Sequence, residues 1–313
     1  MNKLMTIQQA KIYGKNELTS SPTPELDTAV LLQHVTGFDK THLLLNRDFE
    51  LSYEQESDFL AALEKRKTGF PIAYITGHKE FFGLDFYVTP DVLIPKPDTE
   101  LLVELAIDAL EDKFRAKPDA IPTVCDMCTG SGCVGLSIAK TLAGRAKNLA
   151  ENKFSIFNFQ LSISLVDISE KALAVAQKNA ENFQFSTFNF HFIRSNLFEN
   201  IPRTFDLIVT NPPYVPHSES VELLKDGRSE PLLALDGDVD LDGKPSGTDD
   251  GLGLIRHLVP QCYEHLNRNG VLIMETGEYN AEETAELFKQ AGFRNVKIEY
   301  DMNEMMRDVV GIK

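Results

Sequence analysis

The sequence lacks long apolar segments, and this absence limits where the protein can work. No uninterrupted apolar run reaches the roughly 18 residues that a membrane-spanning helix needs. Segment 1–15 contains no apolar core of signal-peptide length. Four cysteines are too few for the disulfide scaffold of a small secreted domain. We therefore expect a reduced, cytoplasmic protein with no membrane partner.

Basic residues are in short supply. The chain has 31 Lys and Arg against 47 Asp and Glu, and its net charge is −16 at pH 7. Binding to a phosphate backbone depends on Lys and Arg, which displace counterions. The charge thus disfavours a direct nucleic-acid partner, although a local basic patch remains compatible with it. An acidic surface suits a basic protein partner.

The length and composition describe a folded protein of about two domains. At roughly 150 residues per domain, 313 residues suggest two. A hydrophobic share of 42% and a charged share of 25% are ordinary for globular proteins and exclude disorder as the main state.

The first third of the chain changes character near residue 80. Residues 1–79 show apolar positions at helical spacing and no strand alternation, which predicts a small helical bundle. Residues 80–97 alternate around a turn and include a strand-like run at 92–94, which predicts a β-hairpin linker. Asp98 is then expected to cap a helix over 99–113.

From 98 to 313, strands alternate with helices. This order predicts an α/β domain with a mostly parallel sheet and helices on both faces. The last two strands have no helix between them, which favours an antiparallel hairpin at the sheet edge. The predicted strands are 124–127, 161–166, 188–192, 205–210, 271–275, 294–300 and 306–312, and the later predicted helices are 171–182, 249–268 and 281–291.

A turn with two glycines follows the first of these strands. It reads Cys128-Thr129-Gly130-Ser131-Gly132, and glycine lets the backbone turn sharply and approach a ligand. Ligands of open α/β sheets sit at the carboxyl ends of the strands, where Asp167 closes the next strand and could accept hydrogen bonds from a ribose diol. The third glycine of a dinucleotide fingerprint is absent, so the turn alone also fits a structure without a ligand.

Cys125 and Cys128 have the spacing of half a metal site or of a redox pair. No second cysteine pair and no nearby histidine cluster completes a zinc site. Cys125 falls in a predicted buried strand, where cysteine behaves as a small apolar residue. We predict no metal.

The most informative segment is Asn211-Pro212-Pro213-Tyr214, at the end of a predicted strand. The two prolines fix φ and remove two N–H groups, so the loop is rigid and offers acceptors. The Asn211 amide oxygen and the Pro212 carbonyl can accept hydrogen bonds from both N–H bonds of a planar, conjugated NH2 group. The ring of Tyr214 offers a flat face. With a sulfonium methyl group held in line, methyl transfer would need mainly positioning.

These motifs, taken in order, resemble those of class I S-adenosylmethionine-dependent amino-methyltransferases and, more narrowly, the HemK/PrmC family of peptide chain release factor N(5)-glutamine methyltransferases. The similarity covers about residues 20–313. Besides the tetrapeptide, it is carried by segments 71–77, 80–84 and 92–100, by Glu230-Pro231 and by 250–252.

The resemblance implies a fold and a function. The fold is a Rossmann-like class I methyltransferase domain with a seven-stranded mixed sheet at 98–313, preceded by a helical domain at 1–79 that binds the substrate protein and by a hairpin linker at 80–97. The implied activity is transfer of a methyl group from S-adenosylmethionine to the glutamine side-chain nitrogen in the Gly-Gly-Gln motif of bacterial class I release factors.

The resemblance also assigns roles by position. Cys128, Thr129, Gly130, Ser131 and Gly132 would line the methionine part of the cofactor, Asp167 would bind the ribose, and Asn196 and Leu197 would flank the adenine. Asn211, Pro212, Pro213 and Tyr214 would hold the glutamine amide, with Asn211, Pro212 and Tyr214 as the catalytic residues and Asn211 also next to the cofactor.

Three features depart from the family pattern. Cys128 stands where the family usually has glycine, and Asn196-Leu197 stands where an acidic-aromatic pair is common. Segment 238–248 is an acidic insertion to which the sequence assigns no role.

Other functions stay open at the level of sequence. A ribosomal-protein glutamine methyltransferase would share the same motifs. A methyltransferase for nucleic-acid amino groups of adenine or guanine would share the tetrapeptide, but it would need a basic track that this chain lacks. A binding module without catalytic activity would not need an intact Asn211-Pro212-Pro213-Tyr214.

Overall fold

The computed structural model describes residues 4–151, 160–185, 188–226 and 230–313. The chain divides into two compact units. The first unit comprises Met1–His78 with Glu222–Ser229, and the second comprises Lys79–Val221 with Glu230–Lys313.

The first unit is helical, as the apolar spacing predicts. Its helices are α1 (Ile7–Glu17), α2 (Pro24–Thr36), α3 (Lys40–Leu45), α4 (Tyr53–Lys67) and α5 (Ile72–Thr76). Capping boxes start α1 at Thr6 and α4 at Ser52, because each hydroxyl accepts a hydrogen bond from the third residue of its helix. The apolar faces meet in one core that includes Leu31, Leu32 and Phe59.

A short hairpin follows. Strands β1 (His78–Phe81) and β2 (Leu84–Tyr87) form a two-stranded sheet. The two residues between them, Phe82 and Gly83, have φ values of 51° and 72°, which is typical of the tight turns that join paired strands.

Two local predictions around residue 95 are wrong. Within the run 92–94 only Val92 is buried, and the run forms no strand, because the Val92 N–H closes a turn on Thr89 and the Ile94 N–H bonds the Glu230 carboxylate. Asp98 does not cap a helix through its side chain. A 3-10 turn, η1 (Pro97–Thr99), precedes α6 (Glu100–Ala116), and the Asp98 carboxylate instead lies 3.5 Å from Arg307.

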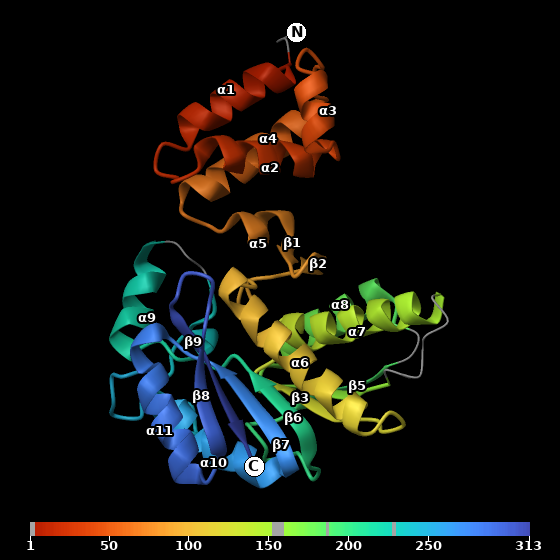
Figure 1. Cartoon of the computed structure of the whole chain (residues 1–313). Coiled ribbons are helices and arrows are strands. Elements are labelled where there is room, and N and C mark those ends of the chain that lie inside the picture. The colour runs from red at the N-terminus through yellow and green to blue at the C-terminus, as the bar shows by residue number, and fades with distance from the viewer. Residues whose placement is uncertain (1–3, 152–159, 186–187, 227–229) are drawn as a thin grey trace. The chain divides into compact units, whose positions relative to one another are not determined.

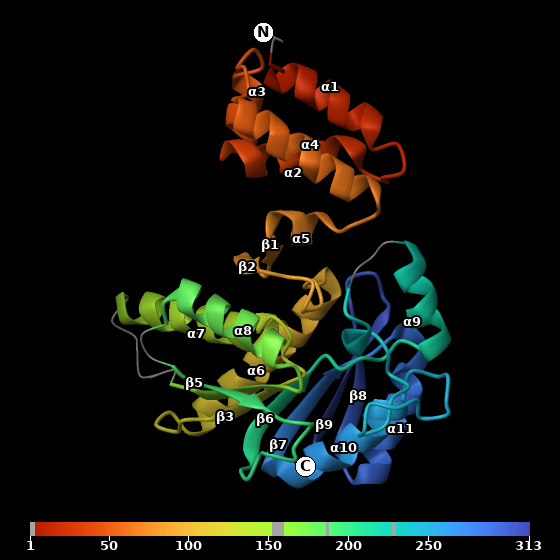
Figure 2. The same ribbon diagram turned by 180° about the vertical axis from the view of Figure 1, so that it is seen from behind.

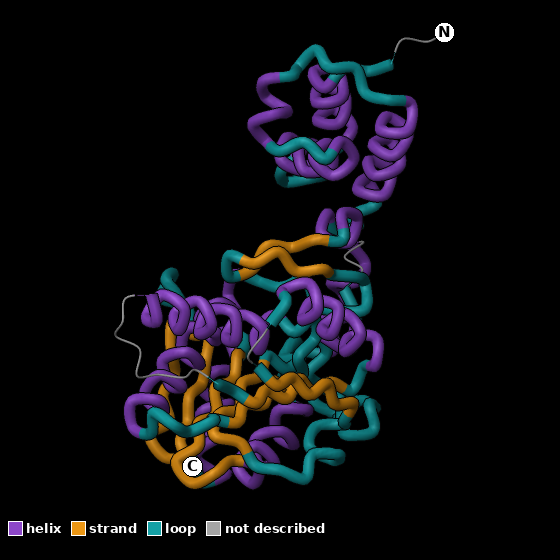
Figure 3. The backbone as a smooth tube through the Cα atoms, turned by 90° about the vertical axis from the view of Figure 1, so that its right-hand side faces the viewer, coloured by secondary structure: helices purple, strands orange, loops and turns teal. Residues whose placement is uncertain are grey.

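The second unit contains the predicted seven-stranded mixed sheet, with strand order β5-β4-β3-β6-β7-β9-β8. The first five of these run parallel, and β8 and β9 pair antiparallel at one edge, as predicted. Figure 3 shows the strands in orange. Their bounds are β3 Thr123–Met127, β4 Ser162–Asp167, β5 Asn189–Arg194, β6 Phe205–Thr210, β7 Leu266–Glu275, β8 Arg294–Tyr300 and β9 Met306–Ile312.

Helices cover both faces of the sheet (Figures 1 and 2). Cys125 and Met127 of β3 pack in one core with residues of α10 and α11, whereas Asp126 between them points to α7 on the other face. The predicted helix over 249–268 is shorter, because β7 begins directly after α10 at Leu266. The helix bounds are α7 Cys133–Glu151, α8 Glu170–Phe183, α9 His217–Leu223, α10 Gly253–His265 and α11 Ala281–Ala291.

Candidate active site

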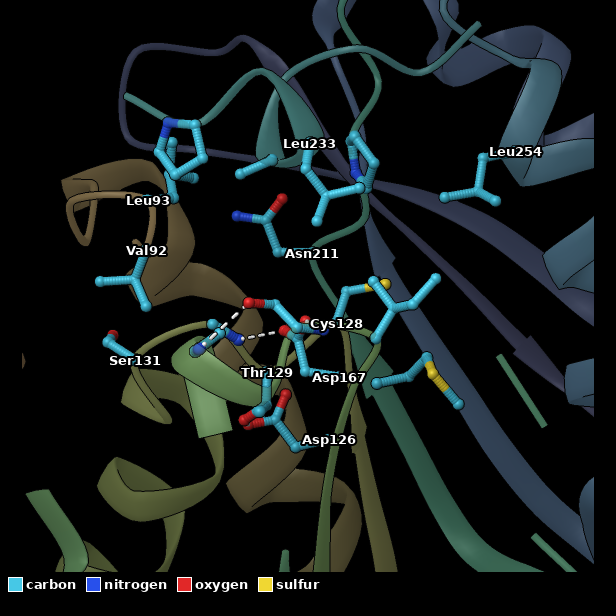
Figure 4. A pocket seen from close by; sticks show the side chains of 18 of the residues that line it. Val92, Leu93, Asp126, Cys128, Thr129, Ser131, Asp167, Asn211, Leu233 and Leu254 are labelled. Atoms are coloured by element: carbon cyan, nitrogen blue, oxygen red, sulfur yellow. Dashed lines mark hydrogen bonds between the residues drawn. The ribbon is translucent and has the colours of Figure 1, made fainter. Parts of the chain in front are cut away.

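A cavity lies at the carboxyl ends of the parallel strands β3, β4, β5 and β6 (Figure 4). Its empty space, counted together with the part open to solvent, is about 1180 Å3. Of the residues that the sequence singled out, the cavity is lined by Cys128, Thr129, Gly130, Ser131, Asp167, Asn196, Leu197, Asn211 and Pro213. Gly132, Pro212 and Tyr214 are not among its lining residues.

The glycine turn after β3 is held by a buried carboxylate. Asp126 Oδ2 accepts hydrogen bonds from Thr129 Oγ1 at 2.6 Å and from the Gly135 backbone N–H at 2.9 Å. Burial raises the pKa of Asp126 to about 7, and the two hydrogen bonds oppose that rise. Sequence reasoning gave Asp126 no role, although an acid inside an apolar strand is a signal of a fixed polar partner.

Cys128 starts the turn in an unusual backbone conformation. Its φ is 59°, in the left-handed region that favours glycine, and its side chain packs against the apolar core. Burial raises the pKa of the thiols of Cys125 and Cys128, so both stay protonated at neutral pH. Within the described residues, no cluster of three or more potential metal ligands occurs.

Asp167 ends β4 at the floor of the cavity. Its two carboxylate oxygens accept 2.9 Å hydrogen bonds from the backbone N–H groups of Gly130 and Ser169. Burial raises the pKa of Asp167, and these bonds to the charged form oppose the rise. Each oxygen keeps a further lone pair, so the carboxylate can still accept from both hydroxyls of a ribose. Its position in the lining fits an adenosine cofactor.

Asn211 reaches the cavity from the end of β6. Its Nδ2 donates a 3.1 Å hydrogen bond to Thr99 Oγ1, and Thr99 also lines the cavity. The bond turns the amide so that its nitrogen faces Thr99, and the amide oxygen, for which no donor is found among the described residues, can accept from a ligand. Figure 4 shows the Asn211 side chain extending into the cavity from the side opposite Asp126.

Tyr214 fixes the corner from behind instead of lining the cavity. Its hydroxyl donates to Glu275 Oε1 at 3.0 Å, and its carbonyl oxygen accepts from Asn280 Nδ2 at 3.1 Å and Tyr279 Oη at 3.2 Å. Burial raises the pKa of Tyr214 well above its usual value, so the ring keeps its proton. The Tyr214 hydroxyl is therefore engaged by Glu275, whereas the sequence analysis assigned a stacking role to the ring.

Glu275, at the end of β7, joins this network. Burial raises its pKa to about 7, and hydrogen bonds from Thr99 and Tyr214 oppose the rise. The same Thr99 hydroxyl can donate to Glu275 and accept from Asn211, since a hydroxyl does both. Thr99 and Glu275 therefore both lie beside the corner formed by Asn211 and Tyr214. Sequence reasoning assigned neither Thr99 nor Glu275.

Distant segments meet at the cavity wall. Lys96 Nζ lies 2.7 Å from Glu230 Oε1, which also accepts a hydrogen bond from the Ile94 N–H at 3.3 Å. These contacts join the segment before α6 to Pro231 and Leu233, and both segments line the cavity. The insertion 238–248 lines another part of the wall through Val239, Asp240, Leu241 and Gly243.

Comparison with known proteins adds independent findings. Residues 9–77 match the family model "PrmC N-terminal domain", and residues 103–226 match "Methyltransferase small domain". No helix in the described part of the chain is long and apolar enough to cross a bilayer.

Similar proteins cover nearly the whole chain. A release factor glutamine methyltransferase of Haemophilus influenzae is 34% identical over 96% of this chain and 95% of its own length. Proteins of the same name from Koribacter versatilis and Escherichia coli are 32% and 31% identical, covering 99% and 95% of this chain and the same shares of their own lengths. Among solved structures, a methyltransferase from Pyrococcus furiosus aligns with 82% of this chain and 98% of its own at 16% identity, with a TM-score of 0.46.

Proposed function

The chain belongs to the family of release factor glutamine methyltransferases, and we propose that the cavity at the ends of β3, β4, β5 and β6 is where it methylates its substrate. The protein transfers a methyl group from S-adenosylmethionine to the side-chain nitrogen of a release factor glutamine. We further propose that this glutamine belongs to the Gly-Gly-Gln motif of bacterial class I release factors.

One observation supports this site above the others. Asn211 and Asp167 line the same cavity. Each side chain is held by a hydrogen bond and keeps an oxygen lone pair that can accept from a ligand. An acceptor at the end of β4 suits the ribose of the cofactor, and an acceptor at the end of β6 suits an N–H group of the substrate amide. The two requirements of the reaction are thus met in one cavity.

The residues of the corner would act by positioning and by electrostatics. When bound, S-adenosylmethionine supplies an electrophilic methyl group. Asn211 Oδ1 would accept a hydrogen bond from one N–H bond of the glutamine amide, and the carbonyl of Pro212, which adjoins the lining residues Asn211 and Pro213, would accept from the other. These acceptors orient the nitrogen lone pair and stabilise the positive charge that develops on nitrogen as the new C–N bond forms. One amide proton then leaves to water, so the mechanism requires no strong base.

The helical unit is proposed to hold the substrate protein. It contains none of the residues that line the cavity. A release factor is far larger than its methylated loop, and a separate unit can bind the part that stays outside the cavity.

Two other kinds of substrate can be distinguished from a release factor by experiment. A ribosomal protein could present a glutamine in the same way, and a nucleic acid could present an adenine or guanine amino group. The net charge of −16 disfavours the nucleic acid.

The test uses tritiated S-adenosylmethionine and three acceptors in parallel: a class I release factor, total ribosomal protein and duplex DNA. We expect label on the release factor and none on DNA. Label on ribosomal protein alone would support the sister activity, and label on DNA, or none on the release factor, would reject the proposed substrate.

A further inference from the structure

The hairpin formed by β8 and β9 ends at the same edge of the sheet as the cavity. Strand β7 runs parallel to β6, and β9 runs antiparallel to β7. Glu275, the last residue of β7, pairs with Asp308 near the start of β9, so the turn between β8 and β9 lies beyond the carboxyl end of β7. The tip of this hairpin, residues 300–306, therefore extends the edge that carries the cavity.

The tip is held by its own hydrogen bonds and by an ion pair with the segment before α6. The Asp301 carboxylate accepts two backbone hydrogen bonds across the turn and a 3.2 Å hydrogen bond from Arg307. Arg307 also lies 3.5 Å from Asp98, and Figure 1 shows the tip beside the start of α6. The residue after Asp98 is Thr99, which lines the cavity and bonds Asn211. The tip is thus fixed next to the proposed amide-binding corner.

Three large apolar side chains are exposed along this edge. Met302, at the tip, is fully exposed, more so than any other large apolar side chain in the described part of the chain. Tyr300 is 55% exposed at the end of β8, and Tyr279 is 57% exposed shortly after β7. The Tyr279 hydroxyl donates to the Tyr214 carbonyl oxygen, so Tyr279 adjoins the corner. None of the three lines the cavity, and exposed tyrosine and methionine are typical of protein-binding surfaces.

The order of the strands indicates what meets this surface. Along the sheet, β4 with Asp167 is followed by β3, then by β6, which leads into Asn211, then by β7, which leads toward Tyr279, and finally by β9 and β8 with Met302 between them. If the cofactor occupies the β4 end of the cavity and the glutamine the corner after β6, the cofactor blocks one direction along the edge. The rest of the substrate protein then lies in the other direction, over the ends of β7, β9 and β8.

The same part of the edge is acidic. Segments 276–283 and 300–306 together contain five Asp and Glu residues and no Lys or Arg. Of these acidic residues, Glu278 and Glu304 are exposed beside Tyr279 and the tip. Opposite charges across an interface speed association and favour the correct partner. The surface therefore fits a protein that is basic next to its methylated loop.

We propose that Tyr279, Tyr300 and Met302 form a docking surface for the release factor, which a basic part of that protein covers while its glutamine lies in the cavity. The surface belongs to the same compact unit as the cavity. It acts in addition to the helical unit and holds the substrate close to the corner. This inference rests on the proposed function and names a second part of the chain that binds the substrate protein.

The test compares methylation of an intact class I release factor by the wild type and by the double variant Tyr300→Ala/Met302→Ala. Both side chains are exposed, so their loss removes contact with the partner and leaves the corner in place. The KM for the release factor should rise at least about fivefold. The kcat and the affinity for S-adenosylhomocysteine should each change less than about twofold, because neither depends on docking. A smaller rise in KM would overturn the proposal.

A matched control is Ile121→Ala. Ile121 is 54% exposed in the same compact unit, but it precedes β3 and so lies at the amino ends of the parallel strands, away from the cavity. Its loss should leave the KM for the release factor within about twofold of the wild type. If Ile121→Ala raised this KM as much as the double variant does, the effect would not be specific to the edge, and the docking surface would be rejected.

Tyr279 is tested by two variants that lose the same hydroxyl. Tyr279→Phe and Tyr279→Ala both remove the hydrogen bond to the Tyr214 carbonyl oxygen, but only the alanine variant removes the ring. The KM for the release factor should be at least about threefold higher for Tyr279→Ala than for Tyr279→Phe. Equal KM values would exclude the ring from the docking surface and contradict the proposal.

The charge of the surface is tested by the double variant Glu278→Gln/Glu304→Gln. At low salt its KM for the release factor should be at least about threefold above that of the wild type, and the difference should disappear at high salt because exposed charges are then screened. Equal KM values at low salt would overturn the basic partner surface. A wild type that leaves the release factor unmethylated would reject the proposed function itself, whereas normal wild-type methylation with an unchanged KM in Tyr300→Ala/Met302→Ala would reject only this inference.

Discussion

Asn211 and Thr99, 112 residues apart in the chain, are joined by a 3.1 Å hydrogen bond from the amide nitrogen of Asn211 to the hydroxyl of Thr99. The bond decides which end of the Asn211 amide is free. It also links the tetrapeptide at the end of β6 to the start of α6, and so makes the proposed amide-binding corner dependent on a residue outside it.

Removal of the Thr99 hydroxyl should therefore impair catalysis without weakening cofactor binding. Thr99→Val keeps the shape of the side chain but loses the acceptor, so Asn211 can turn its nitrogen toward the substrate. We expect kcat to fall about tenfold or more, while the affinity for S-adenosylhomocysteine changes less than about twofold. Thr99→Ser retains the hydroxyl and should restore most of kcat. A Ser variant as slow as the Val variant would show that Thr99 acts by packing alone.

The substitution Asp167→Asn should weaken cofactor binding. An amide offers a single acceptor oxygen in place of two, so it cannot accept from both the Gly130 and Ser169 N–H groups and from a ribose diol. We expect the affinity for S-adenosylhomocysteine, measured by calorimetry, to fall about 10- to 100-fold. The same change at Asp112, an exposed carboxylate on α6 outside the cavity lining, should have no effect. Unchanged affinity in Asp167→Asn would remove this residue from the cofactor site.

Valine at two nearby cysteines should distinguish backbone strain from packing. Cys128 has φ 59°, where a β-branched side chain is strongly disfavoured, whereas Cys125 lies in a strand, where valine is favoured. Cys128→Val should lower the free energy of unfolding by about 1–3 kcal/mol, and Cys125→Val by less than about 1 kcal/mol. Denaturant unfolding measures both. Equal losses would mean that the left-handed turn at Cys128 is not retained in solution.

The buried Asp126 should make stability depend on pH in a defined direction. Its folded pKa of about 7 lies above the roughly 3.9 of an unfolded aspartate, so folding favours the protonated form. The associated stability is fully present below about pH 4 and is lost as the pH rises toward and through 7. Asp126→Asn cannot ionise. The free energy of unfolding of the wild type minus that of this variant should therefore fall by about 2 kcal/mol between pH 5 and pH 8. A constant difference would contradict a raised pKa.

Sequence reasoning works where function depends on local backbone chemistry. The strand before Asn211, the two prolines and the glycine turn are each contained in a few consecutive residues, and their elements appear in the structure where periodicity predicts them. The seven-stranded sheet and its antiparallel edge follow from the order of strands and helices.

Contacts between distant residues are what the sequence does not reveal. Nothing local in Thr99 indicates that it orients Asn211, and nothing local in Tyr214 shows that its hydroxyl already has a partner in Glu275. The apolar run 92–94 has the composition of a strand, yet its N–H groups bond a turn and the Glu230 carboxylate. The insertion 238–248 has an acidic composition, but its contact with Asn196 is made by a backbone carbonyl, which composition does not show.

The central claim is that Asn211 holds a glutamine amide beside the methyl donor. Its most direct test is tandem mass spectrometry of a class I release factor after incubation with S-adenosylmethionine and either the wild-type chain or Asn211→Ala. The account predicts one methyl group on the side-chain nitrogen of the Gly-Gly-Gln glutamine with the wild type. With the variant it predicts a rate lower by about 100- to 1000-fold at nearly unchanged S-adenosylhomocysteine affinity. Methylation at another residue, or an alanine variant that modifies the glutamine as fast as the wild type, would contradict it.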